Sequence, residues 1–290
     1  AMSTFRRLLG LVAPYRWAIA FGVLVSFATM ASSVGLMAMS AYLISRAAIT
    51  NAFVDVAVIV TAVRFFALSR AALRYVERYF NHRTTFRILT HLRVWFYNAV
   101  EPLAPAGLLR QHSGDLLARI VGDIETLENF TLRVLIPPPA ALLTTLVSCA
   151  ILTWFDWSLG LTLLVFAVLA GAVLPWGTRA LSRPATVEAA TVRGQLTVAL
   201  VDETQGLADL LANGREQAQA ATVSGLADRL AVLQQRLALV RGLNIGVAAL
   251  VTGLAGLAVL WLGIPLVAFG RTEGVFLALL PLVAITCFEA

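Results

Sequence analysis

The sequence predicts an all-α membrane protein in which six apolar helices cross the bilayer and two long helical hairpins extend beyond it. The first observation is composition, because 59% of the 290 residues are hydrophobic and only 13% are charged. Few soluble domains could tolerate such a composition on their surface. The second is that six apolar segments approach the length needed to span a membrane. The third is that charged and apolar residues recur at helical spacing in the two long polar stretches between them.

The first two predicted spans cover about residues 17–44 and 53–72. The apolar part of the first is too long for a cleavable signal peptide. Asp55 and Arg64 interrupt the second span, which predicts that one of its faces meets protein or a water-filled cavity. These two residues lie about 13 Å apart along one helix, too far for direct contact. Arg64 is therefore expected to have another partner.

A charged stretch follows the second span, and its residues predict an amphipathic helix that continues out of the membrane. The charged positions are Arg74, Glu77, Arg78, His82, Arg87, His91 and Arg93. Aromatic and aliphatic residues alternate with them at helical spacing. Pro102 and Pro105 end this helix. A second helix is expected to start near Ser113 as its N-cap, with Asp115 in its first turn.

The third and fourth predicted spans, about residues 135–154 and 158–176, form a tight hairpin. The triplet Pro137-Pro138-Pro139 marks the entrance of the third span, since proline is best tolerated in the first turn of a helix. Between the two spans stands the short turn Phe155-Asp156-Trp157, which carries interfacial aromatic rings.

Residues 177–241 predict the second hairpin outside the membrane, with two long helices joined by a turn around residues 213–224. Two sets of apolar residues recur at helical steps: Leu196, Ala199, Leu200, Leu207, Leu210 and Leu211, then Leu226, Leu230, Leu233, Leu237 and Val240. The fifth span covers about residues 243–269, and the sixth covers residues 275–290. Sixteen residues of helix reach only roughly 24 Å, so the sixth span is expected to be truncated and the original chain to be longer.

The basic residues predict the orientation. All 22 are arginines. Eighteen of them lie before the first span or in the two long hairpins, and only Arg46 and Arg271 lie in the opposite loops. By the positive-inside rule the N-terminus and both hairpins are cytoplasmic. Charge of this kind sets membrane topology and gives no reason to expect nucleic acid as a partner. Cys149 and Cys287 stand in apolar segments and are interpreted as core residues.

Six spans with short outer loops and two long cytoplasmic hairpins resemble the transmembrane domain of an ABC exporter, the type I or type IV exporter fold. The segment Gly114-Asp-Leu-Leu-Ala-Arg119, followed by Asp123, is similar to a signature of that family's first hairpin. More specifically, the chain resembles the CydC-like subunit of the heterodimeric, CydDC-type exporter needed for cytochrome bd assembly. The similar segments are residues 32–40, 78–93, 102–108, 206–214 and 288–290.

The resemblance implies several partners. A second six-span half-transporter, CydD-like, would complete a heterodimer, and both would lie in membrane lipid of the bacterial inner membrane. A nucleotide-binding domain would follow the sixth span, with ATP and magnesium as its ligands. This chain contains no Gly-x-x-x-x-Gly-Lys-Ser/Thr loop and no lysine, so by itself it is not expected to hydrolyse ATP. The residues expected to couple the spans to nucleotide-binding domains are Ser113, Gly114, Asp115, Leu116, Arg119, Gly214 and Arg215.

The family is associated with export of the thiol reductants glutathione and cysteine, and with haem binding or haem transfer to the periplasmic side, so the resemblance implies an exporter of haem or of thiol reductants. His82 matches a family histidine for which haem ligation is implied, so haem b is the expected cofactor and His82 its iron ligand. Arg78 stands four residues earlier on the same helical face, where it could pair with a propionate, and Tyr79 adds aromatic surface. Arg64 is the candidate for an anionic group of a thiol substrate.

Other interpretations stay open at this point. A single histidine near a membrane interface is often an ordinary surface or packing residue, and Met30, Met37 and Met39 are more often core residues than sulfur ligands. The chain could also be half of an ABC exporter for lipids, drugs or peptides, or a membrane scaffold or receptor that transports nothing. A soluble enzyme fits worst, since no nucleophile and base, metal cluster or phosphate loop can be assembled from the spacing.

Overall fold

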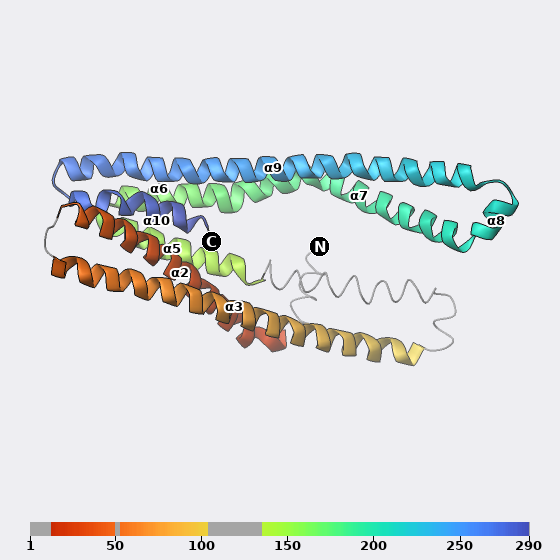
Figure 1. The fold of residues 1–290 in the computed structure, drawn as a ribbon, viewed down its shortest axis with the longest axis horizontal. Helices are drawn as coiled ribbons and strands as arrows, with labels where there is room; N and C mark the ends of the chain where they lie inside the picture. The colour runs from red at the N-terminus through yellow and green to blue at the C-terminus, as the bar shows by residue number, and fades with distance from the viewer. Residues whose placement is uncertain (1–12, 50–52, 104–134, 290) are drawn as a thin grey trace. The chain divides into compact units, whose positions relative to one another are not determined.

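The computed structural model describes residues 13–49, 53–103 and 135–289, and every regular element in these ranges is a helix (Figure 1). Within them, five helices are long and apolar enough to cross a membrane, and a shorter apolar helix follows near residues 274–287. The chain divides into two compact units: residues 1–164 with 255–290, and residues 165–254. The protein is thus an all-α, multi-pass membrane protein, as the sequence predicts.

The first unit is built around α2 (Arg16–Ala47), which packs against α3 (Phe53–Val100), α5 (Pro137–Phe155) and α10 (Leu279–Cys287) (Figure 1). The rings of Phe21 and Phe80 lie 4.5 Å apart. Toward the other end of α2, Tyr42 stacks at 5.3 Å on Phe276, which belongs to the 3-10 turn Gly274–Leu277 before α10. Phe21 faces Phe80, and Gly35, further along α2, faces Phe66, which lies earlier on α3, so the two helices are antiparallel.

The core of the first unit is aliphatic and contains residues from five helical segments. Leu152, Leu159, Leu163 and Leu280 are fully buried in it. Many other large apolar side chains point outward, as expected where lipid replaces water as the solvent. Trp154 and Trp157 are 89% and 70% exposed and flank the turn between α5 and α6 (Trp157–Val168). Tryptophan concentrates at membrane interfaces, so this turn lies at a membrane surface.

Asp156 caps α6 from that turn. The backbone N–H of Ser158 donates to Asp156 Oδ1 at 2.8 Å, which satisfies an otherwise unpaired donor of the first turn. Hydrogen bonds from the Ser158 side chain and then from its backbone N–H, helped by the charge of Arg271, hold the pKa of the Asp156 carboxyl below its usual value. The chain therefore reverses between two spans within a single non-helical residue.

We expect Asp156→Ala to lower the free energy of unfolding by about 1 kcal/mol at neutral pH, because the cap is lost. A carboxyl whose pKa is lower in the folded state stabilises the fold above its unfolded pKa, and this contribution is lost as the pH falls through the folded pKa. The difference between wild type and Asp156→Asn, which keeps the acceptor without the charge, should therefore shrink as the pH falls below the usual carboxyl pKa. Thermal unfolding of the purified transporter at neutral pH and near pH 3 measures both effects; a difference that grows in acid would contradict them.

The second unit contains α7 (Leu174–Gln205), the short α8 (Leu207–Ala212) and the first part of α9 (Glu216–Ala268), with α8 at the end of the helical hairpin (Figure 1). A π-helical segment, Leu169–Val173, leads into α7 just before Pro175. Proline cannot donate the usual helical hydrogen bond, so a wider turn at this position is expected. The turn predicted over residues 213–224 is shorter than expected, because α9 already begins at Glu216.

Packing between α7 and α9 uses small residues on one helix and leucines on the other. Ala185, Ala189 and Val192 are buried together with Leu233, and three further leucines of α9 pack against them, namely Leu226, Leu230 and Leu237. The predicted leucine periodicity of α9 is confirmed here. The helix predicted from the first set of leucines is also present, as α7 and α8, and there Leu200, Leu207 and Leu211 are about half exposed.

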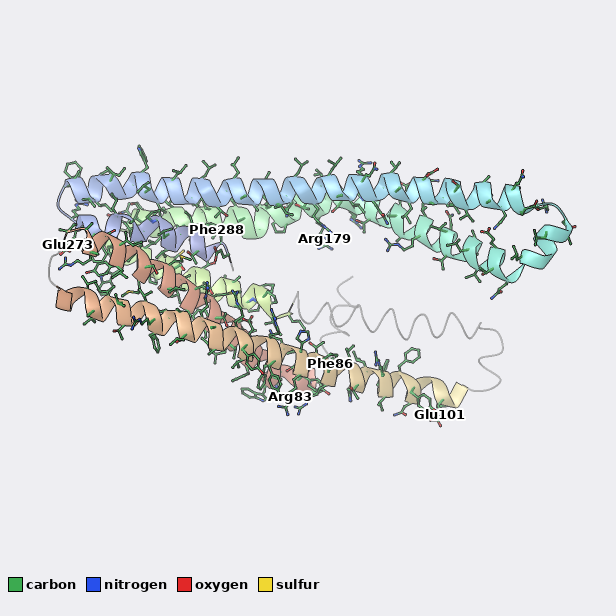
Figure 2. All side chains as sticks on the ribbon, in the orientation of Figure 1. Arg83, Phe86, Glu101, Arg179, Glu273 and Phe288 are labelled. Atoms are coloured by element: carbon green, nitrogen blue, oxygen red, sulfur yellow. The ribbon has the colours of Figure 1, made fainter. Side chains whose placement is uncertain are left out.

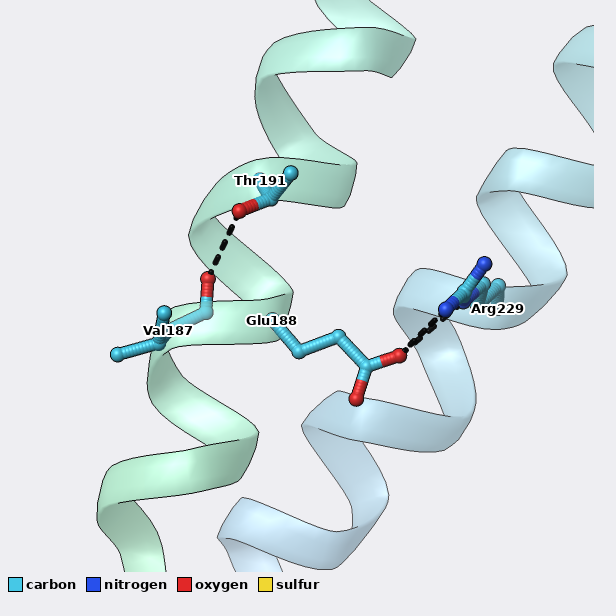
Figure 3. Close-up of polar contacts among 4 residues, drawn as sticks. All are labelled: Val187, Glu188, Thr191 and Arg229. Carbon is cyan, nitrogen blue, oxygen red and sulfur yellow. Dashed lines mark hydrogen bonds and ion pairs between the residues drawn. The ribbon is translucent and has the colours of Figure 1, made fainter.

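A single ion pair joins the same two helices on their exposed side, where Arg229 Nη2 lies 2.6 Å from Glu188 Oε1 (Figure 3). Both side chains are about half exposed, so solvent screens the pair and it adds at most about 1 kcal/mol. The hairpin is held mainly by its apolar contacts.

Candidate functional site

Polar side chains of α2 and α3 face each other in the middle of their contact. Ser26 Oγ donates a 2.6 Å hydrogen bond to Glu77 Oε1, and Ser26 is almost fully buried. One turn earlier on α2 and one turn later on α3, Gly22 faces Asn81. A Cβ added to Gly22 would lie 3.0 Å from Asn81 Oδ1. The small residues on α2 therefore let the polar face of α3 approach closely. Carboxylate and amide groups can then stand inside a largely apolar helix bundle.

A polar cavity of about 440 Å³ opens beside this contact. It is bounded by α2, α3 and the end of α10, all in the first unit. Its lining consists of Thr29, Met30, Ser33, Arg74, Glu77, Arg78, Asn81, His82, Thr286 and Glu289. Most of these residues carry a hydrogen-bonding or charged group. We refer to it below as the polar cavity.

The polar cavity contains charges of both signs. Arg74, Arg78 and His82 follow one another at four-residue steps and so lie along one stripe of α3. Glu77 and Glu289 contribute carboxylates, and Glu77 is engaged by Ser26. Among the described residues, no carboxylate lies within salt-bridge distance of Arg74 or Arg78. Both guanidinium groups therefore remain available to an anionic ligand.

The structure brings together some of the predicted site residues and separates others. Arg78 and His82 both line the polar cavity, and the His82 ring stacks on Phe86 at 6.1 Å. Tyr79 is 54% exposed and does not line the cavity. Arg64 is exposed on α3 roughly 21 Å along the helix from Arg78, and it forms no ion pair with the described part of the chain. The side chains near Arg78 and those near Arg64 are thus separate features of α3.

The sequence analysis missed several residues of the polar cavity. Arg74 stands four residues and Asn81 three residues from Arg78, so helical spacing could have included them, whereas Glu77 directly precedes Arg78 and does not follow from that spacing. Thr29, Ser33 and Glu289 belong to other helical segments. Only the packing of those segments brings them to α3. Met30, considered above as a sulfur ligand, also lines the cavity, and its sulfur lies 3.7 Å from the Thr144 hydroxyl.

The residues predicted to contact nucleotide-binding domains divide into two groups. Gly214 and Arg215 lie exposed at the turn between α8 and α9. Gly214 has a φ of 63°, a left-handed conformation that glycine adopts at little cost. The other group, Ser113, Gly114, Asp115, Leu116 and Arg119, lies outside the described residues.

Comparison with known proteins decides the family. The family described as the ABC transporter transmembrane region matches residues 16–287. This chain belongs to that family. Its six-span, all-α architecture is accordingly that of an ABC exporter transmembrane domain, as the sequence analysis predicts.

Three relatives carry related names. The chain is 28% identical over 286 residues, 97% of its length, to the glutathione/L-cysteine transport system ATP-binding/permease protein CydC of Escherichia coli (strain K12), and covers 50% of that protein. It is 31% identical over 191 residues, 66% of its length, to the corresponding CydD of Bacillus subtilis (strain 168), covering 33% of it. It is 37% identical over 122 residues, 40% of its length, to CydC of Haemophilus influenzae, covering 20% of it. The chain thus spans at most half the length of these relatives.

Proposed function

We propose that this chain is the membrane half of an ATP-driven exporter of thiol reductants, and that the polar cavity binds the exported molecule. The observation that carries the proposal is the pair of guanidinium groups, Arg74 and Arg78, that stand in the cavity with the carboxylates of Glu77 and Glu289. The printed names of the relatives, which concern glutathione and L-cysteine transport, support the choice of substrate class.

The charges of the polar cavity match those of such a ligand. At neutral pH cysteine carries one carboxylate and one ammonium group, and glutathione carries two carboxylates and one ammonium group. Arg74 and Arg78 suit the carboxylates, since a guanidinium forms two parallel hydrogen bonds to one carboxylate. Glu289 and Glu77 suit the ammonium group, and Asn81 offers an amide to a peptide backbone. A cavity of one charge sign would not accommodate both ends of a zwitterion.

Transport by the complete exporter tests this proposal. The full-length protein would be reconstituted with its partner subunit in vesicles with the nucleotide-binding domains outside. ATP-dependent uptake of radiolabelled cysteine and glutathione is the expected result, and uncharged or purely cationic thiols should compete poorly. Equal uptake of a neutral drug or a lipid, with no uptake of either thiol, would favour the other classes of ABC exporter.

A second candidate ligand, haem b, is favoured by one observation: His82, Arg78 and Arg74 line the same cavity. The residues fit the group, because an imidazole nitrogen can ligate iron and two guanidinium groups can pair with two propionates. The Met30 sulfur offers a further donor. In the described residues no cluster of three or more histidine, cysteine, aspartate or glutamate side chains could hold a metal ion by itself.

We expect His82→Ala to abolish the Soret absorption of the full-length complex purified in the presence of haem, because the imidazole ligand is lost. His91→Ala is the matched control, since His91 lies on the same helix outside the polar cavity and should leave the band unchanged. An unchanged spectrum in His82→Ala would assign His82 to packing against Phe86 and leave the thiol substrate as the single candidate.

The remaining parts of the proposal concern the whole transporter. The arginine distribution supports a cytoplasmic N-terminus in a bacterial inner membrane. Similarity to both CydC and CydD proteins supports a heterodimer with a second six-span, CydD-like subunit. The resemblance described in the sequence analysis implies that this heterodimer serves cytochrome bd assembly. Nucleotide-binding domains closing on ATP would push on the hairpin tips around Ser113–Arg119 and Gly214-Arg215. The spans would then rock and open the polar cavity to the outside.

A further inference from the structure

A second concave surface on α3, separate from the polar cavity, is lined by arginines and aromatic rings. It has a volume of about 690 Å³, and its lining includes Tyr15, Arg83, Phe86, Arg87, His91 and Val94. We call it the arginine groove. None of its lining residues lines the polar cavity, although the Phe86 ring stacks on His82. Neither the proposed transport nor haem binding uses this surface.

Helical spacing arranges the arginine groove as two parallel stripes. Arg83, Arg87 and His91 follow one another at four-residue steps, so successive side chains stand about 6 Å apart along α3. Phe86, Thr90 and Val94 form the neighbouring stripe at the same spacing. Figure 2 shows Arg83 and Phe86 on this part of α3. A cationic edge thus runs beside an apolar edge for two turns of helix.

The positive charge of the groove has no partner in the described part of the chain. Arg83 and Arg87 are exposed, and no described carboxylate lies within salt-bridge distance of either. Two like charges at an i,i+4 spacing repel each other, so their arrangement favours binding of an anion.

The wall of the groove is fixed by packing. Tyr15, at the end of the 3-10 turn Ala13–Tyr15, packs against the buried residues Ile88 and Leu92 of α3. Its ring meets the His91 ring edge-on at a centroid distance of 6.2 Å. The groove is therefore a shaped surface between two chain segments rather than a row of arginines on an isolated helix.

The depth of the groove in the membrane follows from the pairing of α2 with α3. Trp17 is 77% exposed and its ring lies 5.8 Å from the Arg16 guanidinium, an arrangement typical of the membrane interface. Tyr15 contacts His91 and Phe21 contacts Phe80, so the antiparallel register places Trp17 level with the segment between these two residues. Arg83 and Arg87 belong to that segment. The arginine groove therefore lies at the depth of lipid headgroups, which moves the membrane surface on α3 beyond residue 72, where the sequence analysis ended the second span.

We propose that the arginine groove binds an anionic phospholipid, with its phosphate on Arg83 and Arg87 and its glycerol and upper acyl chain against Phe86 and Val94. Guanidinium groups bind phosphate through paired hydrogen bonds, and basic surfaces at the membrane interface select anionic lipids. The adjacent apolar stripe distinguishes a lipid from a free anion. With the proposed orientation, the site faces the cytoplasmic leaflet.

Native mass spectrometry of the full-length transporter, titrated with phosphatidylglycerol, tests the site. Arg83→Gln/Arg87→Gln should weaken binding of the first phosphatidylglycerol roughly 30-fold, since two charges near the membrane surface are removed. Arg93→Gln is the matched control, because Arg93 is an exposed arginine of α3 outside the groove, and it should change the affinity by less than about twofold. Arg87→Lys, which keeps the charge and loses the paired geometry, should fall between them.

Three results would overturn the proposal. Equal weakening by Arg93→Gln would show attraction to general surface charge. Equal affinity for zwitterionic phosphatidylcholine would show that the groove does not select the net negative charge of the lipid. Displacement of the lipid by millimolar inorganic phosphate would show an anion site without acyl-chain contact. If the double variant cannot be purified, the phosphatidylglycerol affinities of Arg87→Gln and Arg93→Gln are compared instead. Each variant removes one charge, and the one inside the groove should weaken binding more. Thiol transport does not enter this measurement, so its outcome is independent of the proposed function.

Discussion

Arg78→Ala is expected to raise the KM for thiol uptake by about 10- to 100-fold, because it removes a charge-assisted pair with a substrate carboxylate. Arg78 lines the polar cavity and forms no ion pair within the described residues, so the substitution leaves no carboxylate of the protein unpaired there. The loss should therefore appear in substrate affinity rather than in folding. Uptake of labelled cysteine and glutathione into vesicles containing the complete exporter measures it.

Two variants make the result specific. Arg78→Lys keeps the charge and should recover part of the affinity, while Arg93→Ala removes an exposed arginine of the same helix outside the polar cavity and should leave the KM unchanged. Glutathione, with its second carboxylate, should lose more affinity than cysteine in an Arg74→Ala/Arg78→Ala variant. An unchanged KM in Arg78→Ala would show that the exported molecule binds elsewhere.

Periodicity within one helix identified two of the ten residues that line the polar cavity. Arg78 and His82 were identified from their four-residue spacing, and the same spacing extends to Arg74. Thr29 and Glu289 could not be identified in this way, because they reach the cavity only through the register between α2, α3 and α10. That register depends on side-chain packing between segments distant in sequence, which a single sequence does not display.

For Arg64 too, the sequence alone does not show which helix face contacts its neighbours. A charge within an apolar span indicates a polar surrounding, and that argument suggested a substrate contact. The structure places Arg64 exposed on α3 and outside the polar cavity, so a substrate contact at Arg64 stays a prediction. Helical spacing could not show which face of α3 meets α2. The spans themselves were easier to predict, because their apolar composition is a local property, as in α5, which begins at Pro137 as expected.

Gly160→Val is expected to disrupt folding more than any other substitution considered above. Gly160 is buried in α6, where a Cβ would overlap Thr153 Oγ1 and lie 3.0 Å from the Cys149 carbonyl oxygen of α5. The hydroxyl of Thr153 could rotate away only by giving up its 2.7 Å hydrogen bond to that carbonyl, and the backbone oxygen cannot move without distorting α5. We expect a loss of about 3 kcal/mol in the free energy of unfolding, measured by thermal unfolding and by monodispersity in size-exclusion chromatography.

A double-mutant cycle separates this overlap from a general intolerance of larger residues. Gly160→Ala should destabilise the hairpin, and adding Thr153→Ala should restore part of the loss, since it removes the hydroxyl that the new Cβ would meet. Thr153 is exposed, so Thr153→Ala alone should cost little. Gly171→Ala is the matched control, because no atom lies within 4 Å of the Cβ that it would add. Additive effects of Gly160→Ala and Thr153→Ala would show that the two helices can separate at this turn. A double variant that loses less stability than the sum of the two single variants would show that the side chains at 153 and 160 are in direct contact. The turn at Asp156 and the contact at Gly160 would then together hold α5 and α6 as a rigid pair.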